Sequence, residues 1–328
     1  MKSKKDCKIL KEDYIMKIEE EKQNIKAHIS IPEFAKANLT YEESYRVVFT
    51  LIKHEVFHLK NIHTSESIDE LKAYPLQIAS RILKSASTLH TIIEQNKDYV
   101  VANAIVRTLA DTMASLYLIY QEHGEEMVLR HYLYVMDGIN NRLKYLPENM
   151  FYDNSISKDE FDILMRQVAA SKTHYTEARQ HCQAKIRELS LYSGRAAVIE
   201  NFMEKCNWKY KTLGSSNSQK NKYTWNEMYN LLHLKCDSGF FSFLGEFVHG
   251  LSTSNIAFEP DVVDFEPVYG AAIVLLGRLY EFTNNYYADD MNIVQAKAIT
   301  GLADVGMPQK YVDYLLNELS KLKEKGRC

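Results

Sequence analysis

The chain has 328 residues, of which 46% are hydrophobic and 25% are charged, and its formal net charge is −3. These values are typical of a soluble globular protein with enough residues for one large domain or two. The nearly neutral charge argues against broad electrostatic binding to nucleic acid or to acidic lipid.

Cysteine usage and the N-terminal sequence both favour a cytoplasmic protein. The five cysteines are far apart, odd in number and form no C-x-x-C pair. A disulfide framework or a zinc site built from cysteines is therefore not expected, and a reducing compartment fits best. The first residues, MKSKKDCKILKEDY, lack the apolar core of a signal peptide.

The longest apolar run extends from Tyr99 to Tyr120 and contains neither glycine nor proline. Apolar residues point in almost every direction around this predicted helix, so we expect it to be buried on most sides. The run is long enough to span a bilayer, but Arg107 and Asp111 near its centre would each cost roughly 2.5–3.5 kcal/mol on insertion. It therefore predicts a core helix, and no membrane partner is expected.

The segments before this run are also predicted to be helical. Residues 1–28 form a charge-rich helical stretch, and a helix over 40–63 begins with the capping-box pattern T-x-x-E. A further helix over 67–95 contains Pro75. We expect this proline to kink or split the helix, because it removes a helical hydrogen bond.

Helical periodicity continues after the central run. The ranges predicted to be helical are 125–146, 157–190, 196–206, 223–234, 240–248, 268–282, 291–305 and 308–323. Residues 253–267 contain two prolines and no helical period, which predicts a long loop. Because no β pattern exceeds a few residues, the sequence predicts an all-α fold, a multi-helix bundle.

The sequence suggests four segments rather than clearly separate domains. They are N-terminal helices (1–66), a central helical bundle (67–207), a linker (208–224) and C-terminal helices (225–328) that pack on the same core. The linker rests on the Gly- and Ser-containing stretch LGSSNSQ at 213–219. The many apolar helices are compatible with a homodimer.

One candidate site is the sequence His54-Glu55-Val56-Phe57-His58 on a predicted helix. Two imidazoles four residues apart can hold one zinc ion, and the Glu between them can act as a general base on metal-bound water. Together with Glu70, the motif resembles zinc peptidases that cleave helix-turn regulators, which implies a metallopeptidase with Glu70 as third ligand. The interpretation that we favour is a polar edge on an amphipathic helix, with no cofactor.

The second candidate site is a polar stripe on the central helix. Asn103, Arg107, Asp111 and Ser115 follow one another at steps of four and so share one face. A buried Arg and Asp must be paired and hydrogen-bonded, so another helix has to meet this stripe. With His249, the stripe could recognise phosphate or a nucleotide, since such recognition needs convergent donors. The alternative is a structural network that fixes helix register.

Two short motifs carry a resemblance to a known family. Arg107-Thr108-Leu109-Ala110-Asp111 matches R-x-x-x-[DE], and His249-Gly250-Leu251-Ser252 matches H-G-x-S. The stretch over roughly 78–255 resembles a bacterial all-helical family known as a domain of unknown function. The resemblance implies a binding or regulatory protein in bacterial defence or stress, with a protein or nucleotide partner.

The same arrangement is distantly similar to the HEPN class of helical ribonucleases and nucleotide-binding domains. The ribonuclease members use an Arg and a His on one helix, separated by four to six residues. Here Arg46 and His54, and likewise Arg166 and His174, are separated by seven. That mechanism is therefore not supported, and a HEPN-like nucleic-acid or nucleotide-processing enzyme is kept as an alternative function.

Overall fold

The computed structural model describes residues 40–147, 150–153, 155–214, 220–233, 238–249, 259–307, 309, 312–313 and 315–317. Every regular element in these ranges is a helix and none is a strand, which confirms the predicted all-α fold. Within the same ranges, no helix combines the length and the apolar character that crossing a membrane requires. The predicted helix over 1–28 and most of the one over 308–323 lie outside the described residues.

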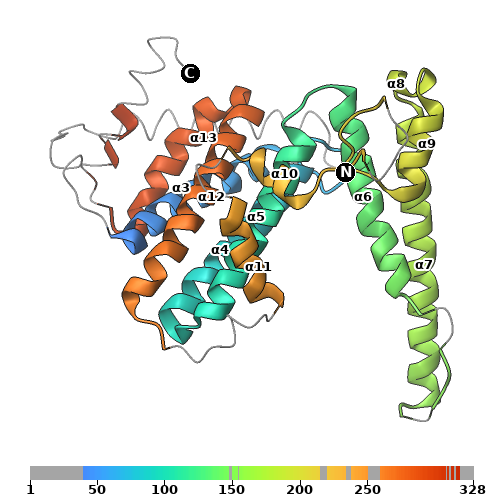
Figure 1. Ribbon diagram of the computed structural model, residues 1–328, viewed down its shortest axis with the longest axis horizontal. Coiled ribbons are helices and arrows are strands. Elements are labelled where there is room, and N and C mark those ends of the chain that lie inside the picture. The colour runs from blue at the N-terminus through green and yellow to red at the C-terminus, as the bar shows by residue number, and fades with distance from the viewer. Residues whose placement is uncertain are drawn as a thin grey trace. The chain divides into compact units, whose positions relative to one another are not determined.

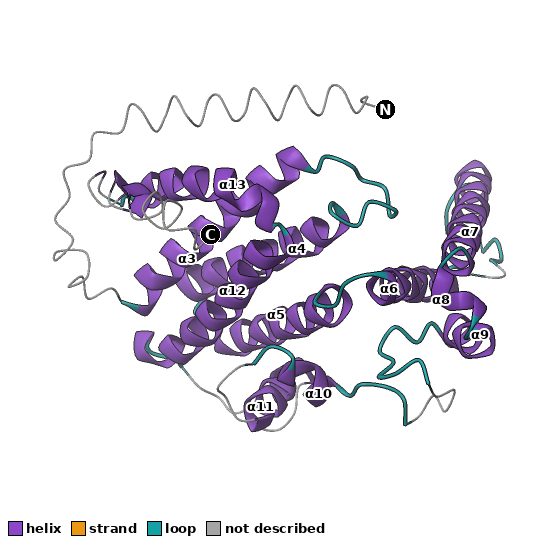
Figure 2. Ribbon diagram, turned by 90° about the horizontal axis from the view of Figure 1, so that it is seen from above, coloured by secondary structure: helices purple, strands orange, loops and turns teal. Residues whose placement is uncertain are grey.

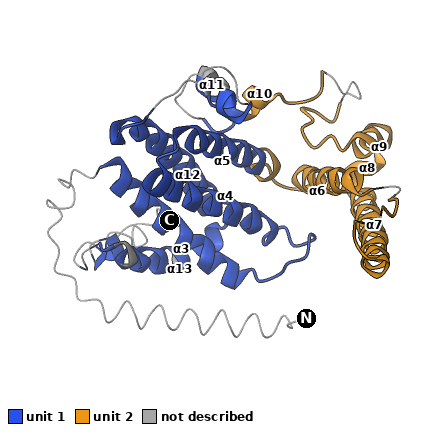
Figure 3. Ribbon diagram, turned by 90° about the horizontal axis from the view of Figure 1, so that it is seen from below, with its two compact units in different colours: residues 1–117, 229–328 blue, residues 118–228 orange. Residues whose placement is uncertain are grey.

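The chain forms two compact units, which Figure 3 shows in different colours. The first contains residues 1–117 and 229–328, and the second contains residues 118–228. These boundaries fall within two helices, the central one and a short one near residue 228. They differ from the predicted segment boundaries, because a helix that continues from one unit into the other leaves no loop signal in the sequence.

Helix α3 (Tyr41–Ile62) is the centre of the first unit. It begins as predicted, with a capping box in which the Thr40 hydroxyl accepts from the Glu43 amide and the Glu43 carboxylate accepts from the Thr40 amide. The elements that contact it are α4 (Tyr74–Thr91), α12 (Glu266–Tyr286), α13 (Ala288–Thr300) and the 3₁₀-helix η4 (Gly301–Val305). Figure 1 shows these helices from opposite ends of the chain side by side.

Helix α4 begins later than predicted. Pro75 lies in its first turn, where a missing amide hydrogen breaks no helical hydrogen bond. The proline therefore starts the helix and does not kink it, and residues 64–73 form loop and turns. The helix continues into a π-helix, η1 (Ile92–Asn96), which ends at Lys97 with a left-handed φ of 51°.

Helix α5 (Tyr99–Tyr120) has the predicted bounds. Its burial is less complete than expected, because Val100 and Val101 are 36% and 39% exposed at its N-terminal end. The Tyr117 hydroxyl donates to the carbonyl of Arg278 in α12 at 2.8 Å, and Tyr99 packs edge-on against Phe247. Phe247 belongs to α11 (Ser238–His249), and Figure 2 shows α5 between α12 and α11.

The rest of the first unit differs from the prediction mainly in helix lengths. The predicted helix over 223–234 is the short α10 (Trp225–Asn230), and the range 291–305 is divided between α13 and η4. A 3₁₀-helix, η3 (Val262–Phe265), leads into α12, and Pro267 occupies the first turn of α12 as the sequence suggests. Residues 215–219 of the predicted linker lie outside the described ranges.

The second unit is built on α6, which contacts α7 and α9. Its helices are α6 (Glu125–Tyr145), α7 (Lys158–Arg187), α8 (Ser190–Ser193) and α9 (Ala196–Lys205). The buried guanidinium of Arg130 donates to the carbonyls of Trp208 and Tyr210 at 3.1 and 2.8 Å, which fixes the segment after α9 on α6. The thiols of Cys182 and Cys206 are buried.

Candidate functional site

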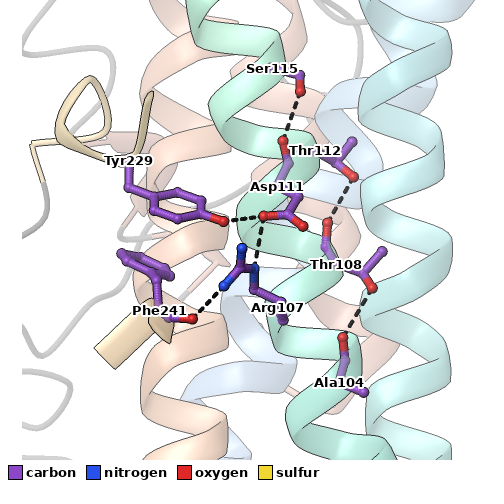
Figure 4. Close-up of polar contacts among 8 residues, drawn as sticks. All are labelled: Ala104, Arg107, Thr108, Asp111, Thr112, Ser115, Tyr229 and Phe241. Atoms are coloured by element: carbon purple, nitrogen blue, oxygen red, sulfur yellow. Dashed lines mark hydrogen bonds and ion pairs between the residues drawn. The ribbon is translucent and has the colours of Figure 1, made fainter. Parts of the chain in front are cut away.

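The polar stripe on α5 is paired as its spacing predicts (Figure 4). The Arg107 Nε donates to the Asp111 Oδ1 at 3.0 Å, and the two side chains are 16% and 33% exposed. The Tyr229 hydroxyl of α10 donates to the same carboxylate oxygen. One terminal nitrogen of Arg107 donates to the carbonyl of Phe241 in α11. The α10 and α11 helices are therefore the elements that meet the stripe.

Aromatic rings complete this contact between α5, α10 and α11. The Arg107 guanidinium carbon lies 5.1 Å from the centre of the Tyr229 ring, which in turn stacks on Phe241 at 4.2 Å. Burial, and then the hydrogen bond to Asp111, raise the pKa of Tyr229, so its phenol stays protonated and keeps donating. Gly245 of α11 comes so near that a Cβ there would lie 3.4 Å from Arg107. Arg107, Asp111 and Tyr229 thus find their hydrogen-bond partners within this network, which holds α5, α10 and α11 together in the first unit. We call these three residues, with the carbonyl of Phe241, the clamp.

The other predicted members of the site do not join this clamp. The Asn103 amide donates to the carbonyl of Tyr99, and the Ser115 hydroxyl donates to the carbonyl of Asp111, both at 2.9 Å on their own helix. His249 is exposed at the end of α11 and makes no hydrogen bond with any residue of the described ranges. The clamp therefore offers a phosphate few uncommitted donors.

The H-E-x-x-H motif lies on α3, with the rings of His54 and His58 6.2 Å apart between centroids. Glu55 points into the core, is fully buried, and accepts a hydrogen bond from the Thr283 hydroxyl of α12 at 3.2 Å. Burial raises the pKa of Glu55 to about 8, so its carboxyl group is protonated at neutral pH. Glu55 is therefore oriented toward the core and toward α12.

The two histidines are also not arranged as zinc ligands with Glu70. The His54 ring packs on Gly301 so closely that a Cβ there would lie 2.5 Å from it. Glu70 is exposed in the loop before α4. Within the described ranges, the ligand atoms of His54, His58 and Glu70 do not converge within 4.8 Å of one another. The geometry gives no support to the zinc peptidase alternative.

A different set of titratable side chains does converge. Glu42 of α3, His90 of α4 and Glu94 of η1 each offer one ligand atom, and these atoms all lie within 4.8 Å of one another. The Tyr269 hydroxyl of α12 lies 3.0 Å from the His90 Nδ1 and donates to the Glu94 Oε1 at 3.0 Å. The cluster therefore joins four elements of the first unit.

Three residues of the cluster, Glu42, Glu94 and Tyr269, line a cavity of about 220 Å³. Its charged lining residues are Glu42, Glu94, Glu266 and Lys97. Its apolar lining includes the side chains of Ile93 and Phe265. We call this cavity the acidic pocket, because three carboxylates and one ammonium group give its lining a formal charge of −2.

The sequence carried only a faint signal of the acidic pocket. His90 and Glu94 are four residues apart, a spacing that places side chains on one helix face, but such pairs are common on helices. Glu42 is distant in the chain, and the π-helix that carries Glu94 has no recognisable sequence pattern. π-Helices are rare and often lie at functional sites, and η1 carries Glu94 of this cluster.

Comparison of the chain with protein-family models, with curated proteins and with solved structures found no match. The resemblance to the bacterial helical family therefore stays a prediction that rests on the motifs at 107–111 and 249–252.

Proposed function

We propose that the chain is a helical binding or regulatory protein that takes a positively charged ligand in the acidic pocket. The observation that carries this proposal is the excess of carboxylates over cations in the lining of one cavity. The lining contains three glutamates, Glu42, Glu94 and Glu266, and one lysine, Lys97. A concave surface lined by one sign of charge concentrates ions of the opposite sign.

The size and the apolar part of the pocket support a small ligand. A cavity of about 220 Å³ accommodates a cationic group with a short apolar stem, which can pack on Ile93 and Phe265. Phosphate and nucleotide ligands are disfavoured there by the same carboxylates. The acidic pocket therefore favours binding of a cation over the nucleotide-processing alternative.

The proposal is tested by thermal unfolding of the full chain with butylammonium chloride, butanol and sodium butyrate at constant ionic strength. Butylammonium at ten times its Kd should add about 1.4 kcal/mol to the free energy of unfolding by mass action. Butanol and butyrate, which have the same stem without the positive charge, should add much less.

Two variants locate the effect. Glu266→Gln removes one exposed carboxylate of the pocket and should weaken butylammonium binding about 2- to 5-fold. Glu177→Gln makes the same change on the exposed surface of α7 and should leave binding unchanged. The proposal is contradicted if butanol and butylammonium stabilise the chain equally. It is also contradicted if Glu266→Gln and Glu177→Gln weaken butylammonium binding to the same extent.

A further inference from the structure

Two glutamates of the acidic pocket, Glu42 and Glu94, form the donor set of a metal site together with His90, which lies outside the lining of the pocket. Glu42 and His90 are half-buried and Glu94 is exposed, and each offers one ligand atom within 4.8 Å of the other two. Within the described ranges, theirs is the only group of three or more His, Cys, Asp or Glu side chains with this convergence. The set consists of two carboxylate oxygens and one imidazole nitrogen.

The Tyr269 hydroxyl orients two of these three ligands. Because its proton is donated to Glu94, its oxygen accepts from the Nδ1–H of His90. A neutral His90 ring then carries its lone pair on Nε2, which is the form that binds a metal. Hydrogen bonds of this kind to metal ligands fix their orientation and raise metal affinity.

The cluster rests on a buried aromatic support. The Tyr45 ring lies 6.0 Å from the His90 ring and 5.1 Å from the Tyr269 ring, between centroids. Its hydroxyl donates to the carbonyl of Ala86 at 2.6 Å. Since Tyr45 is almost completely buried, His90 and Tyr269 are held in place before any ligand binds.

The spacing of the ligand atoms is within reach of one ion. Ligands bonded at about 2.1 Å lie roughly 3 to 4.2 Å from one another in tetrahedral or octahedral geometry. The three ligand atoms lie within 4.8 Å of one another. Small side-chain rotations, which the exposed Glu94 can make, would bring them to the distances that one ion requires. Solvent or a ligand in the pocket can supply the remaining positions.

The donor set selects the class of metal. Magnesium and calcium take oxygen ligands almost exclusively, whereas imidazole suits zinc, iron, cobalt and nickel. One imidazole with two carboxylates therefore fits a divalent transition metal better than an alkaline-earth ion.

We propose that Glu42, His90 and Glu94 bind a divalent transition-metal ion at the edge of the acidic pocket, where Glu42 and Glu94 belong to its lining, with Tyr269 as a positioning residue. This inference rests on the proposed cation binding of the same pocket and adds a metal ion to the cations that the pocket binds. Because the metal and an organic cation both use Glu42 and Glu94, each should displace the other.

Isothermal titration of the full chain, without a histidine tag, with CoCl₂, ZnCl₂ and MgCl₂ tests the inference. One equivalent of Co²⁺ or Zn²⁺ should bind per chain, with Mg²⁺ at least about 10-fold weaker. His90→Gln and Glu94→Gln should each weaken Co²⁺ binding at least about 10-fold, and Tyr269→Phe about 10-fold. The exposed position of Glu94 keeps the test valid if His90→Gln folds poorly.

Two control variants test whether the metal binds at Glu42, His90 and Glu94. Glu177→Gln should leave Co²⁺ binding unchanged, and so should His58→Gln, which alters the H-E-x-x-H motif instead. Loss of binding in His58→Gln with retention in Glu94→Gln overturns the inference, as does the absence of stoichiometric binding to the wild type. If butylammonium still stabilises the wild type while Co²⁺ does not bind, the inference fails and the proposed function stands. If neither binds, both fail.

Discussion

Arg107 uses its donors to hold helices together. Its Nε and one terminal nitrogen are committed to Asp111 and to the carbonyl of Phe241, and Tyr229 closes the network. A lysine at this position carries the charge but not the planar fork, so it cannot make both contacts at once. If Arg107 holds α11 against α5, its replacement should make local unfolding of α11 more frequent.

Arg107→Lys should speed backbone amide exchange in residues 238–249 about 10-fold or more. A hydrogen bond to a charged group contributes about 1.5–3 kcal/mol, and its loss lets α11 open more often. Hydrogen–deuterium exchange with mass spectrometry measures this. Arg166→Lys on the exposed face of α7 is the matched control. Unchanged exchange in α11 would show that Arg107 is not a clamp.

Glu55 should make the stability of the fold depend on pH. Its pKa is about 8 in the folded protein, against an ordinary value of 4.5. Between these values the folded state holds one proton more than the unfolded state, so the free energy of unfolding falls as pH rises. The fall should reach about 3 kcal/mol between pH 4.5 and pH 7, since each pH unit contributes about 1.4 kcal/mol.

Glu55→Gln mimics the protonated side chain and should remove this part of the pH dependence. Urea unfolding at several pH values should then give a flatter curve for the variant, with the largest gain over wild type near pH 8. In Glu177→Gln, the free energy of unfolding should depend on pH as steeply as in the wild type. Parallel curves for wild type and Glu55→Gln would mean that Glu55 is ionised in the folded protein.

Two helical elements, η4 and α3, can pack closely because Gly301 of η4 has no side chain. The His54 ring occupies the place that a Cβ would take. Gly301 has an ordinary helical backbone, with φ −64° and ψ −13°, so an alanine there would be tolerated but for this contact. The surroundings of His54 in the H-E-x-x-H motif are thus explained by packing between α3 and η4.

Gly301→Ala should destabilise the fold by about 1–3 kcal/mol, because a methyl group forced into a packed contact displaces its neighbour. His54→Ala in the same chain should recover most of the loss, as a double-mutant cycle in urea would show. The control is Gly277→Ala within α12, where a Cβ meets nothing within 4 Å and about 0.5–1 kcal/mol should be gained. An additive cycle would contradict the contact.

At the scale of the whole molecule, local sequence rules predicted the helices well. The capping box at Thr40 marks the start of α3, and the apolar run at 99–120 gives α5 its bounds. The prediction for Pro75 was wrong because proline is tolerated in a first turn, and sequence alone does not say which turn it occupies. The boundaries of the two compact units fall within helices, where the sequence carries no loop signal.

The sites were harder to predict than the helices. The step of four between Arg107 and Asp111 predicted their pairing, since this relation lies within one helix. Their partners Tyr229 and Phe241 depend on how distant helices meet, which periodicity does not encode. The acidic pocket was missed for the same reason, because Glu42 joins His90 and Glu94 only when α3 packs beside α4.

The most direct test of cation binding in the acidic pocket is a methyl NMR titration of the full chain, labelled at isoleucine, with butylammonium chloride. Ile93 lines the pocket, whereas Ile199 is buried in the second unit. We predict that the Ile93 methyl resonance shifts and saturates while that of Ile199 stays in place, and that butanol at the same concentration has little effect. An unmoved Ile93 resonance, or an equal shift with butanol, would contradict cation binding at this pocket.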